Sequence, residues 1–428
     1  MLFKNPYLHQ VPLDNGGARL ANLSTGELLE LDRDEFHSFK ALQDPRGDFQ
    51  RHALLVKDIE NVRQTVFLRH RVACQQPAVF NLTLLPTLAC NLACTYCFEQ
   101  NPPPFRMSDV IADAVVALVH KEAQRHLRVE LAWFGGEPLL EIERILSLQK
   151  ECSKVCKQAK CEFRSSITTN GFFLNESNAT SLLAAGINFF HITLDGDKSI
   201  HDANRPTKKG YGSFDQIYAN IIGLMEINPS VRLLIRVNGR LGEGNSIFQV
   251  LENIPVIHRN RIMIHFHRVI DSCQKLNSSD EWINQACEVS KHACRLGYAN
   301  STDHFFNPGP AVYCYAERLT SAVVDPRGWV YKCAFTNFSS SERVGILQQD
   351  GFIKHSGHFL HAWERLVALE PIECMSCEYL PLCGFGCPRS RGEKNRSPGC
   401  KDSFRAIVDS QLVKGLVGTE SSSLSTRP

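Results

Sequence analysis

The chain has 428 residues, of which 43% are apolar, and a formal net charge of +2. This length and composition predict a globular protein of two or three domains with a large buried core. Because the charges nearly balance and no long basic run occurs, we expect neither a nucleic acid nor a membrane as a partner. The composition favours a small molecule or a peptide as the substrate.

The 17 cysteines are interpreted as thiols of a reducing compartment rather than as disulfides of a secreted protein. Residues 1–6 open no apolar signal segment, and no run of about 18 uncharged apolar residues is long enough to span a bilayer. We therefore expect a cytoplasmic protein in which clustered thiols serve as metal ligands.

Residues 1–79 contain one cysteine, Cys74. Extended segments at 18–23 and 27–31 precede a helical pattern at 34–42. Strands followed by helices in about 80 residues predict a small α+β module. At the other end of the chain, the serine-rich composition of residues 411–428 predicts a disordered tail.

Residues 80–300 alternate apolar strands with amphipathic helices. The predicted strands are 80–85, 129–134, 163–169, 189–194, 231–237 and 262–269, and the helices are 108–126, 139–159, 175–185, 214–227, 246–257 and 281–296. Six such units predict a parallel sheet, either flat and doubly wound or an open barrel. Ser213 and Gln216 have capping-box spacing, and Gly186 stands where a helix should stop.

Three cysteines at spacings of four and three, Cys90, Cys94 and Cys97, follow the first of these strands. Three thiolates on one loop suit a [4Fe–4S] cluster and leave one iron open to a small molecule, because the cubane needs four ligands. A structural zinc site is the alternative, but zinc motifs usually pair two CxxC knuckles, or CxxC with HxxxH. The spacing therefore favours iron.

Distinctive residues also follow the next three strands, where parallel barrels gather their chemistry. They are Gly-Gly-Glu-Pro at 135–138, Thr-Asn-Gly at 169–171, and Thr-Leu-Asp-Gly at 193–196 with His-Asp-Ala-Asn-Arg at 201–205. Two glycines let a backbone approach a ligand, and a carboxylate suits a cation. We expect Asp195 and Arg205 to shape the loop rather than to bind the ligand.

Residues 301–410 are rich in glycine, proline and cysteine, and seven cysteines form a second ligand set: Cys314, Cys333, Cys374, Cys377, Cys383, Cys387 and Cys400. Residues 325–331 predict a hairpin whose turn uses Pro and Gly. A zinc ribbon is the alternative to iron in this region. Cys152, Cys156 and Cys161 imitate a ligand triad but lie along a helix, so we interpret them as ordinary reduced cysteines.

The cysteine triad and the motifs after the next strands resemble the radical S-adenosylmethionine (SAM) superfamily, and the second cysteine set is similar to its SPASM extension. The resemblance covers roughly residues 80 to 405. It implies an α/β fold with a partial (β/α)6 TIM-like barrel between the α+β module and a SPASM domain at 301–410. In that superfamily the open iron binds SAM, and reductive cleavage of SAM yields a 5′-deoxyadenosyl radical that takes a hydrogen atom from the substrate.

The resemblance also implies which residues contact SAM: Tyr96, Gly135, Gly136, Glu137, Thr169, Asn170, Thr193, Arg236 and Asn238. Glu137 and the backbone around it are expected to receive the ammonium group of SAM, and Thr193 stands where serine is common. His265, His267 and Asp271, after the sixth strand, are candidates for handling a substrate proton, with core or surface roles as the alternative.

Two auxiliary [4Fe–4S] clusters are implied in the SPASM domain. The nearer cluster takes Cys314, Cys333 and Cys387, and the farther one takes Cys374, Cys377, Cys383 and Cys400. The nearer cluster then lacks a fourth cysteine, because Thr320 stands where some relatives have one. Either a residue from elsewhere, with Cys273, Cys287 and Cys294 as thiol candidates, supplies the bond, or one iron is open to a substrate thiolate.

SPASM proteins mostly modify ribosomally made peptides or proteins, so the resemblance implies a maturase that forms a crosslink, oxidises a side chain or epimerises a centre. A module like residues 1–79 often resembles a winged-helix domain that binds a precursor's leader peptide, and a simple cap is the alternative. Anaerobic sulfatase maturation by formylglycine formation is the second option, although those enzymes usually begin near the triad. A non-enzymatic iron–sulfur protein is the rival outside this class, and the implied electron donor is a flavodoxin or ferredoxin.

Overall fold

The computed structural model describes residues 1–75, 78–99, 103–240, 242–269, 279–299, 314–357 and 372–386. The chain forms two compact units. The first comprises Met1–Gln75, Thr302–Arg318 and Glu364–Pro428, and the second comprises Gln76–Ser301 and Leu319–Trp363. The domain boundaries that we expect near residues 79 and 300 stay predictions. Within the described ranges, no helix combines the length and apolar character needed to cross a membrane.

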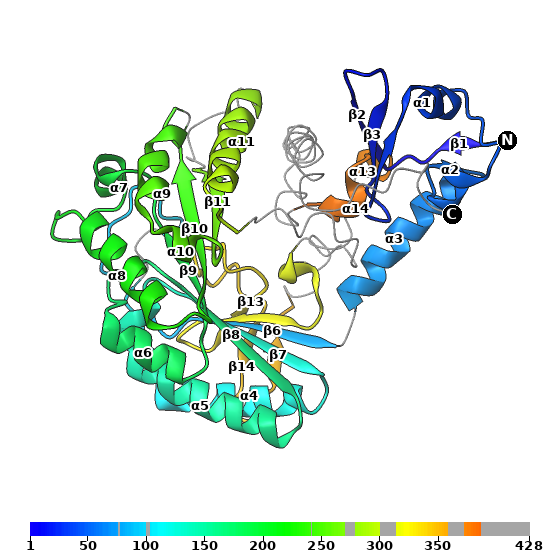
Figure 1. Ribbon diagram of the computed structural model, residues 1–428. Helices are drawn as coiled ribbons and strands as arrows, with labels where there is room; N and C mark the ends of the chain where they lie inside the picture. Colours follow the sequence, from blue (N-terminus) through cyan, green and yellow to red (C-terminus); the bar gives the residue numbers. More distant parts are fainter. Residues whose placement is uncertain are drawn as a thin grey trace. The chain divides into compact units, whose positions relative to one another are not determined.

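The second unit is built on a sheet of ten strands (Figure 1). Its parallel part consists of β6 (Val79–Leu84), β7 (Arg128–Trp133), β8 (Glu162–Thr169), β9 (Phe189–Thr193), β10 (Arg232–Gly239) and β11 (Ile262–Arg268). These strands are neighbours in chain order, and every adjacent pair is parallel. All six predicted strands are therefore confirmed.

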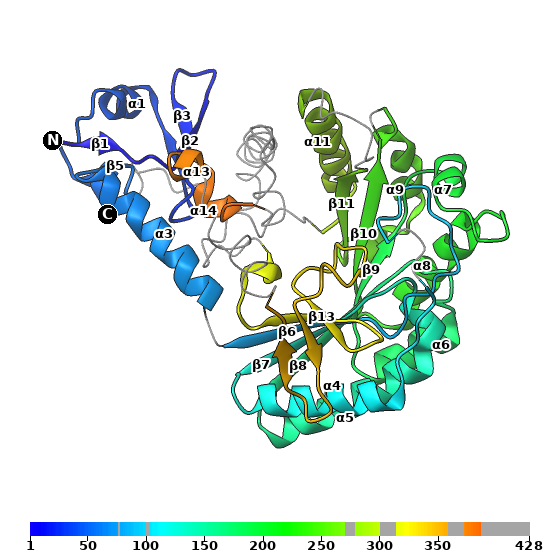
Figure 2. The same ribbon diagram turned by 180° about the vertical axis from the view of Figure 1, so that it is seen from behind.

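Long helices connect the parallel strands and line the outer side of the sheet in both views (Figure 1 and Figure 2). They are α4 (Asp109–Ala123), α5 (Ile142–Gln158), α6 (Glu176–Ala184) and α8 (Phe214–Ile227), with α11 (Ser279–Arg295) following β11. Shorter helices are α7 (Lys198–Asn204), α9 (Phe248–Asn253) and α10 (Val256–Arg259). Right-handed crossovers between strands in chain order place the helices on one face, as in an open barrel. A doubly wound sheet would carry helices on both faces.

The core of the second unit lies between this sheet and its helices. Along β7, Val129, Leu131 and Trp133 are buried, and they join the same cluster as Val115 and Leu118 of α4. Strand alternation sends every second side chain to this apolar layer. The remaining strand positions and the loops after the strands are therefore available for polar residues.

One helix-capping prediction is wrong and another is confirmed. Ser213 precedes α8, but its hydroxyl donates to Arg205 O at 2.7 Å and makes no cap bond. Asp202 Oδ1 instead accepts from Ser213 N at 2.7 Å and from Phe214 N at 2.8 Å. Tertiary contact has thus replaced the local cap. Gly186 ends α6 as predicted, with a φ of +88°.

Four short strands extend the sheet beyond β6: β12 (Ser321–Val324), β13 (Trp329–Tyr331), β14 (Gly345–Leu347) and β15 (Ile353–His355). β12 pairs with β6 in parallel, and the following strands pair in antiparallel order. The predicted hairpin is confirmed: Asp325 N donates to Trp329 O at 3.0 Å, and Gly328 in the turn has a φ of +75°.

The first unit contains the predicted α+β pattern. Its strands are β1 (Phe3–Lys4), β2 (Leu8–Pro12), β3 (Ala18–Asn22), β4 (Glu27–Leu31) and β5 (Leu55–Val56), and its helices are α1 (Arg33–Lys40), α2 (Asp48–Arg51) and α3 (Ile59–Gln75). β2, β3 and β4 form an antiparallel sheet. Asp32 and Glu35 form a capping box at the start of α1, whereas α3 lies beyond the helical segment that we predicted.

Two C-terminal helical turns, α13 (Ile372–Met375) and α14 (Leu380–Cys383), pack against this module. Both views of the first unit place them beside β2 and β3 (Figure 1 and Figure 2). Tyr379, Leu380 and Phe385 share a buried apolar cluster with Tyr7 and Val66. Segments from opposite ends of the chain therefore make one hydrophobic core.

Candidate functional site

The three cysteines of the triad lie on the loop 85–98, directly after β6. Two main-chain hydrogen bonds hold this triad loop to the end of α7 and the residues after it: Thr95 N donates to Asn204 O at 3.0 Å, and Ala93 N donates to Pro206 O at 2.8 Å. Cys90 and Cys94 are partly buried, and Cys97 is exposed. The anchored loop keeps all three thiols at the carboxyl end of the first parallel strand.

Gly135 and Gly136 allow the loop after β7 to pack directly on the triad loop. Gly135 has a φ of +130°, and a Cβ at this residue would lie 2.4 Å from Thr87 O. A Cβ on Gly136 would lie 2.4 Å from Ala89 O, which is too close for any side chain. The glycines are therefore required by the fit of two backbone segments, in addition to any contact with a ligand.

The buried carboxylate of Glu137 ties the loop after β7 to the end of β8. Its Oε1 accepts from Thr169 Oγ1 at 2.7 Å and from Leu139 N at 3.0 Å, and its Oε2 accepts from Asn170 N at 2.7 Å. Burial raises the pKa of this carboxyl, and the same hydrogen bonds counteract the rise. Glu137 thus positions two loops, and its predicted contact with a ligand cation stays a prediction.

Asn170 connects the end of β8 to the cysteine loop. Its Nδ2 donates to Asn91 Oδ1 at 2.8 Å and lies 3.8 Å from Cys90 Sγ. Burial, followed by the charge of Glu137, raises the pKa of the Cys90 thiol to about 12. A thiol in this setting ionises only when a strong positive charge, such as that of iron, binds it.

A buried polar network surrounds the Tyr96 hydroxyl. This hydroxyl donates to Asp195 Oδ2 and accepts from Arg205 Nη1 at 2.9 Å and from Asn238 Nδ2 at 3.1 Å. Asn238 N and Nδ2 both donate to Asp195 Oδ1, at 3.0 and 3.2 Å. The network ties the triad loop to the ends of β9 and β10, with Asp195 and Arg205 in the loop-shaping positions that we expected.

The charge of Arg205 acts directly on the triad. Burial raises the pKa values of Cys90 and Cys97, and the guanidinium of Arg205 works in the opposite direction. Two buried donors, Arg205 Nε and Asn91 Nδ2, have no hydrogen-bond partner within the described part of the chain. Three thiols, a buried cation and uncommitted donors fit an iron–sulfur cluster with three protein ligands.

The ends of β10 and β11 bring Arg236, Asn238, His265 and His267 together. Arg236 is opposite His265, and Asn238 is opposite His267, in the parallel register. His267 Nε2 and His265 Nδ1 are 3.0 Å apart. Burial, aided by the charge of Arg236, lowers the pKa of His265 to about 4 and that of His267 to about 2. Both imidazoles are therefore neutral at neutral pH, so they can accept a hydrogen bond but are weak bases for taking up a proton.

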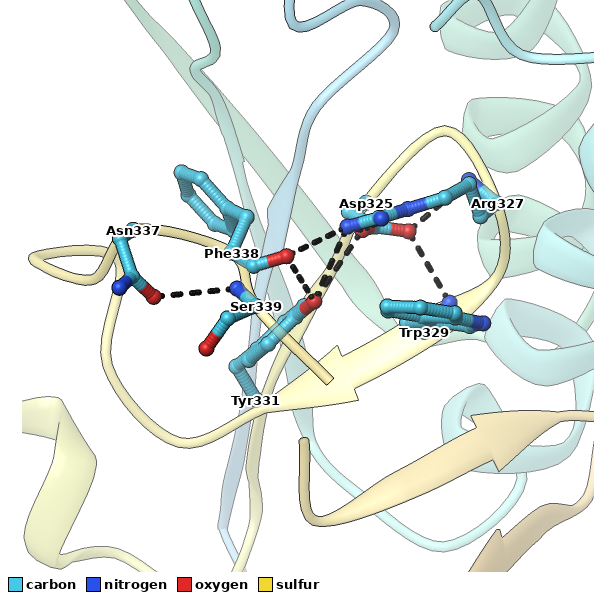
Figure 3. A network of polar contacts seen from close by, with 7 residues as sticks. All are labelled: Asp325, Arg327, Trp329, Tyr331, Asn337, Phe338 and Ser339. Atoms are coloured by element: carbon cyan, nitrogen blue, oxygen red, sulfur yellow. Dashed lines mark hydrogen bonds and ion pairs between the residues drawn. The ribbon is translucent and has the colours of Figure 1, made fainter. Parts of the chain in front are cut away.

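Figure 3 shows the contacts that hold the hairpin preceding Cys333. Arg327 Nε donates to Asp325 Oδ2 at 2.8 Å, and its Nη2 donates to Phe338 O at 2.7 Å. The guanidinium also lies 3.8 Å from the centre of the Trp329 ring. Tyr331 OH donates to Phe338 O at 3.0 Å. Arg327 and Tyr331 thus close the loop that carries Cys333 between β13 and β14.

An aromatic contact joins the triad loop to the loop of Cys333. The rings of Phe98 and Phe335 have centroids 4.5 Å apart. Phe98 directly follows Cys97, and Phe335 N donates to Cys333 Sγ at 3.3 Å. The second unit therefore places a candidate auxiliary ligand next to the candidate site for the reactive cluster.

Eleven further cysteines fall into four groups. Cys374 lies on α13, Cys383 on α14 and Cys377 between them, and Cys377 N donates to Cys374 O at 3.0 Å. Cys152, Cys156 and Cys161 are buried in the core of the second unit, as expected for ordinary thiols. Cys287 and Cys294 lie on α11, whereas Cys273, Cys387 and Cys400, together with Asp271, lie outside the described residues.

Comparison with known proteins decides the family. The radical SAM superfamily profile matches residues 84–243. A cysteine-type anaerobic sulfatase-maturating enzyme of Clostridium perfringens is 31% identical over 341 residues, which are 72% of this chain and 88% of the relative.

The chain belongs to the radical SAM superfamily.

Solved structures of this superfamily share its fold. Native anSMEcpe with bound AdoMet and Cp18Cys peptide aligns with a TM-score of 0.62 at 19% identity, covering 78% of this chain and 98% of that one. Streptococcus suis SuiB bound to S-adenosylmethionine aligns with a TM-score of 0.53 at 14% identity, covering 93% and 99%. This protein is accordingly a radical SAM maturase, and SAM and a [4Fe–4S] cluster are the cofactors of that family.

Two residues of this radical SAM site carried no local signal in the sequence. Asn91, inside the triad loop, receives the Asn170 amide, and Asn220 of α8 donates to Gly171 O at 2.8 Å and to Phe172 O at 3.0 Å. Asparagine is common in loops and helices, so its spacing along the chain does not mark a partner 49 residues away. Only the packing of α8 against the end of β8 identifies Asn220.

Proposed function

We propose that this radical SAM maturase cleaves SAM reductively and takes a hydrogen atom from a residue of a ribosomally made peptide or protein. The main supporting observation is that hydrogen bonds link the loops at the strand ends to one another and to the cysteine loop. Glu137, Asn170, Asp195 and Asn238 each bond to an element outside their own loop. Bound SAM supplies the radical precursor, and the chain's own residues hold the triad in place.

The first experiment is direct. Anaerobically purified protein should be brown and, when given a reductant, should convert SAM to 5′-deoxyadenosine. A flavodoxin or ferredoxin is the proposed physiological donor and should replace the chemical reductant. Colourless, sulfide-free protein that contains zinc at the triad would contradict the proposal.

The proposed SAM contacts are the nine residues that the resemblance implies: Tyr96, Gly135, Gly136, Glu137, Thr169, Asn170, Thr193, Arg236 and Asn238. The structure supports a common location, because the bonds described above link the ends of β6, β7, β8 and β10. His265 and His267 are proposed to face the substrate as neutral imidazoles. A substrate-bound crystal structure in which neither imidazole comes within hydrogen-bond distance of substrate or SAM would remove that role.

Two auxiliary [4Fe–4S] clusters are proposed in the SPASM region, with the ligands given above. The turn geometry at Cys374 and Cys377 supports the farther cluster, and the position of Cys333 supports the nearer one. The nearer cluster has three cysteines, so an open iron there would bind a substrate thiolate. A cysteine-containing peptide should then perturb its electron paramagnetic resonance signal in protein that lacks the triad cysteines.

The first unit is proposed to bind the leader of a precursor peptide. The fold similarity to SuiB extends over 93% of this chain, against 78% for anSMEcpe, which favours a maturase that carries an N-terminal module. Hydrogen–deuterium exchange of the intact enzyme with its precursor should show protection in residues 8–31. Unchanged exchange at saturating peptide would reduce the module to a cap.

Formylglycine formation is a second candidate, favoured by the 31% identity to the sulfatase-maturating enzyme over 88% of its length. Incubating the enzyme with a sulfatase peptide that has cysteine or serine at the target position distinguishes formylglycine formation from modification of a precursor peptide. An aldehyde trapped by a hydrazide on that peptide would favour the second candidate. Modification of a precursor peptide without any aldehyde on the sulfatase peptide would favour the first.

A further inference from the structure

Three metal-ligating side chains meet in the core of the first unit, outside the radical site. His70 and Cys74 come from α3, and Glu317 comes from the 3-10 turn η3 (Tyr315–Glu317). Their exposed fractions are 5%, 6% and 1%. We refer to them as the His70–Cys74–Glu317 cluster. None of them belongs to the ligand sets of the iron–sulfur clusters considered above.

The local sequence explains why these side chains converge. His70 and Cys74 are four residues apart, so they project from the same face of α3. Glu317 N donates to Cys314 O at 3.1 Å, and this bond closes the turn that carries Glu317. The His70 ring also packs edge-on against Phe385, with centroids 5.1 Å apart. The cluster therefore lies against apolar side chains, where a metal ion would be shielded from water.

The spacing of the three ligand atoms matches a tetrahedral metal site, and the Cys74 thiol also lies within hydrogen-bond distance of the His70 imidazole. His70 Nε2 lies 3.6 Å from Glu317 Oε1 and 3.6 Å from Cys74 Sγ, and all three atoms lie within 4.8 Å of one another. Tetrahedral zinc with bonds of about 2.3 Å to sulfur and about 2.1 Å to nitrogen and oxygen separates its ligand atoms by about 3.4–3.6 Å.

A partly buried imidazole–carboxylate pair elsewhere in this chain provides the contrast. His126 Nε2 lies 2.8 Å from Glu122 Oε2, which is a hydrogen bond. The corresponding 3.6 Å between His70 and Glu317 is too long for one. The longer spacing leaves room for an ion that both side chains contact.

We propose that His70, Cys74 and Glu317 bind a structural zinc ion that links α3 to the η3 turn within the first unit. One thiolate, one imidazole and one carboxylate suit zinc, whereas magnesium and calcium prefer oxygen ligands. The fourth position is left for water or one further donor. The ion holds together two segments that are more than 240 residues apart in the chain, and it stabilises the turn directly after Cys314.

The test uses the intact holoenzyme with its iron–sulfur clusters reconstituted and then exposed to zinc. Elemental analysis should find about one zinc per chain, and X-ray absorption at the zinc edge should show one sulfur with about three nitrogen or oxygen neighbours. Cys74→Ala, His70→Gln and Glu317→Gln should each lose most of that zinc. His126→Gln and Cys152→Ala are the matched controls and should keep it, and Cys74→Asp should restore binding without sulfur in the shell.

Several outcomes would overturn the site. They are an absence of zinc from the loaded wild-type protein, a sulfur-dominated zinc shell that indicates binding at cluster cysteines, and full retention of zinc in Cys74→Ala. Loss of iron instead of zinc from Cys74→Ala would make Cys74 a cluster ligand and would also contradict the proposal. The absorption spectrum of the wild-type protein decides the question even if the variants fail to fold.

Discussion

The two candidate cluster regions of the chain are held by different forces. In the second unit, buried hydrogen bonds fix the triad loop, and they connect Glu137, Asn170, Tyr96 and Asp195 to neighbouring strand ends. In the first unit, the turns that carry Cys374, Cys377 and Cys383 rest on an apolar cluster of the N-terminal module. Directional bonds suit a site that must orient a reactive ligand, whereas apolar packing suits a site that needs only to be held and covered.

Removal of any triad cysteine should have the largest effect on activity. Replacing Cys90, Cys94 or Cys97 with alanine removes one of the three protein ligands, so formation of 5′-deoxyadenosine should fall to background. Product quantification after anaerobic incubation with SAM and reductant is the measurement. Persistent cleavage in a folded variant would reject the triad as the active site.

Replacing the cysteines that pack on the apolar cluster of the first unit should affect the peptide reaction more than SAM cleavage. Cys374→Ala or Cys383→Ala should abolish peptide modification and leave most of the uncoupled SAM turnover, because these residues belong to the other unit. Iron content and both activities are measured on the same preparation. Equal loss of both activities, with the first cluster intact, would show that the two regions are not separable.

Glu137→Gln tests how much the buried hydrogen bonds contribute to stability and to SAM binding. The new amide presents its NH2 group to one of two backbone donors, Leu139 N or Asn170 N, so we expect a loss of about 1–3 kcal/mol in unfolding free energy and weaker SAM binding. Glu143→Gln, at an exposed position, is the control. Thermal unfolding and SAM titration give the two quantities, and unchanged values in both would show that the carboxylate is dispensable.

The change with the smallest expected effect at neutral pH concerns acid stability. His201 is buried, its Nδ1 accepts from Asp195 N at 3.3 Å, and burial, aided by the charge of Arg205, lowers its pKa to about 3. An unfolded chain protonates this residue near pH 6.5. Between these values the unfolded state therefore binds one more proton, and stability falls as the pH falls.

His201→Gln should remove this dependence on pH. The slope of the unfolding free energy should decrease by at most about 1.4 kcal/mol per pH unit over the range from about 6.5 down to 3. Denaturant unfolding at several pH values is the measurement, with the exposed His120→Gln as its control. An unchanged slope in the His201 variant would show that this imidazole does not titrate during unfolding.

Sequence reasoning correctly predicted the six parallel strands of the second unit. The alternation of apolar strands with amphipathic helices predicted all six strands correctly, because burial against a sheet or helix gives the apolar residues a regular spacing along the chain. The cysteine spacing and Gly-Gly-Glu-Pro are local signals as well, and they lie on two loops that the structure packs against each other. The capping role assigned to Ser213 was wrong, because Asp202, eleven residues earlier, supplies the bonds that a local rule gives to Ser213.

The sequence alone determined that three thiols share one loop after the first barrel strand, and that seven more cysteines follow the barrel. Only the tertiary structure decided what surrounds them. It showed that the two glycines serve backbone packing, that Arg205 lies beside the triad, and that Glu317 meets His70 and Cys74. Contacts between residues far apart in the chain depend on how elements pack, and no spacing along one chain encodes that packing.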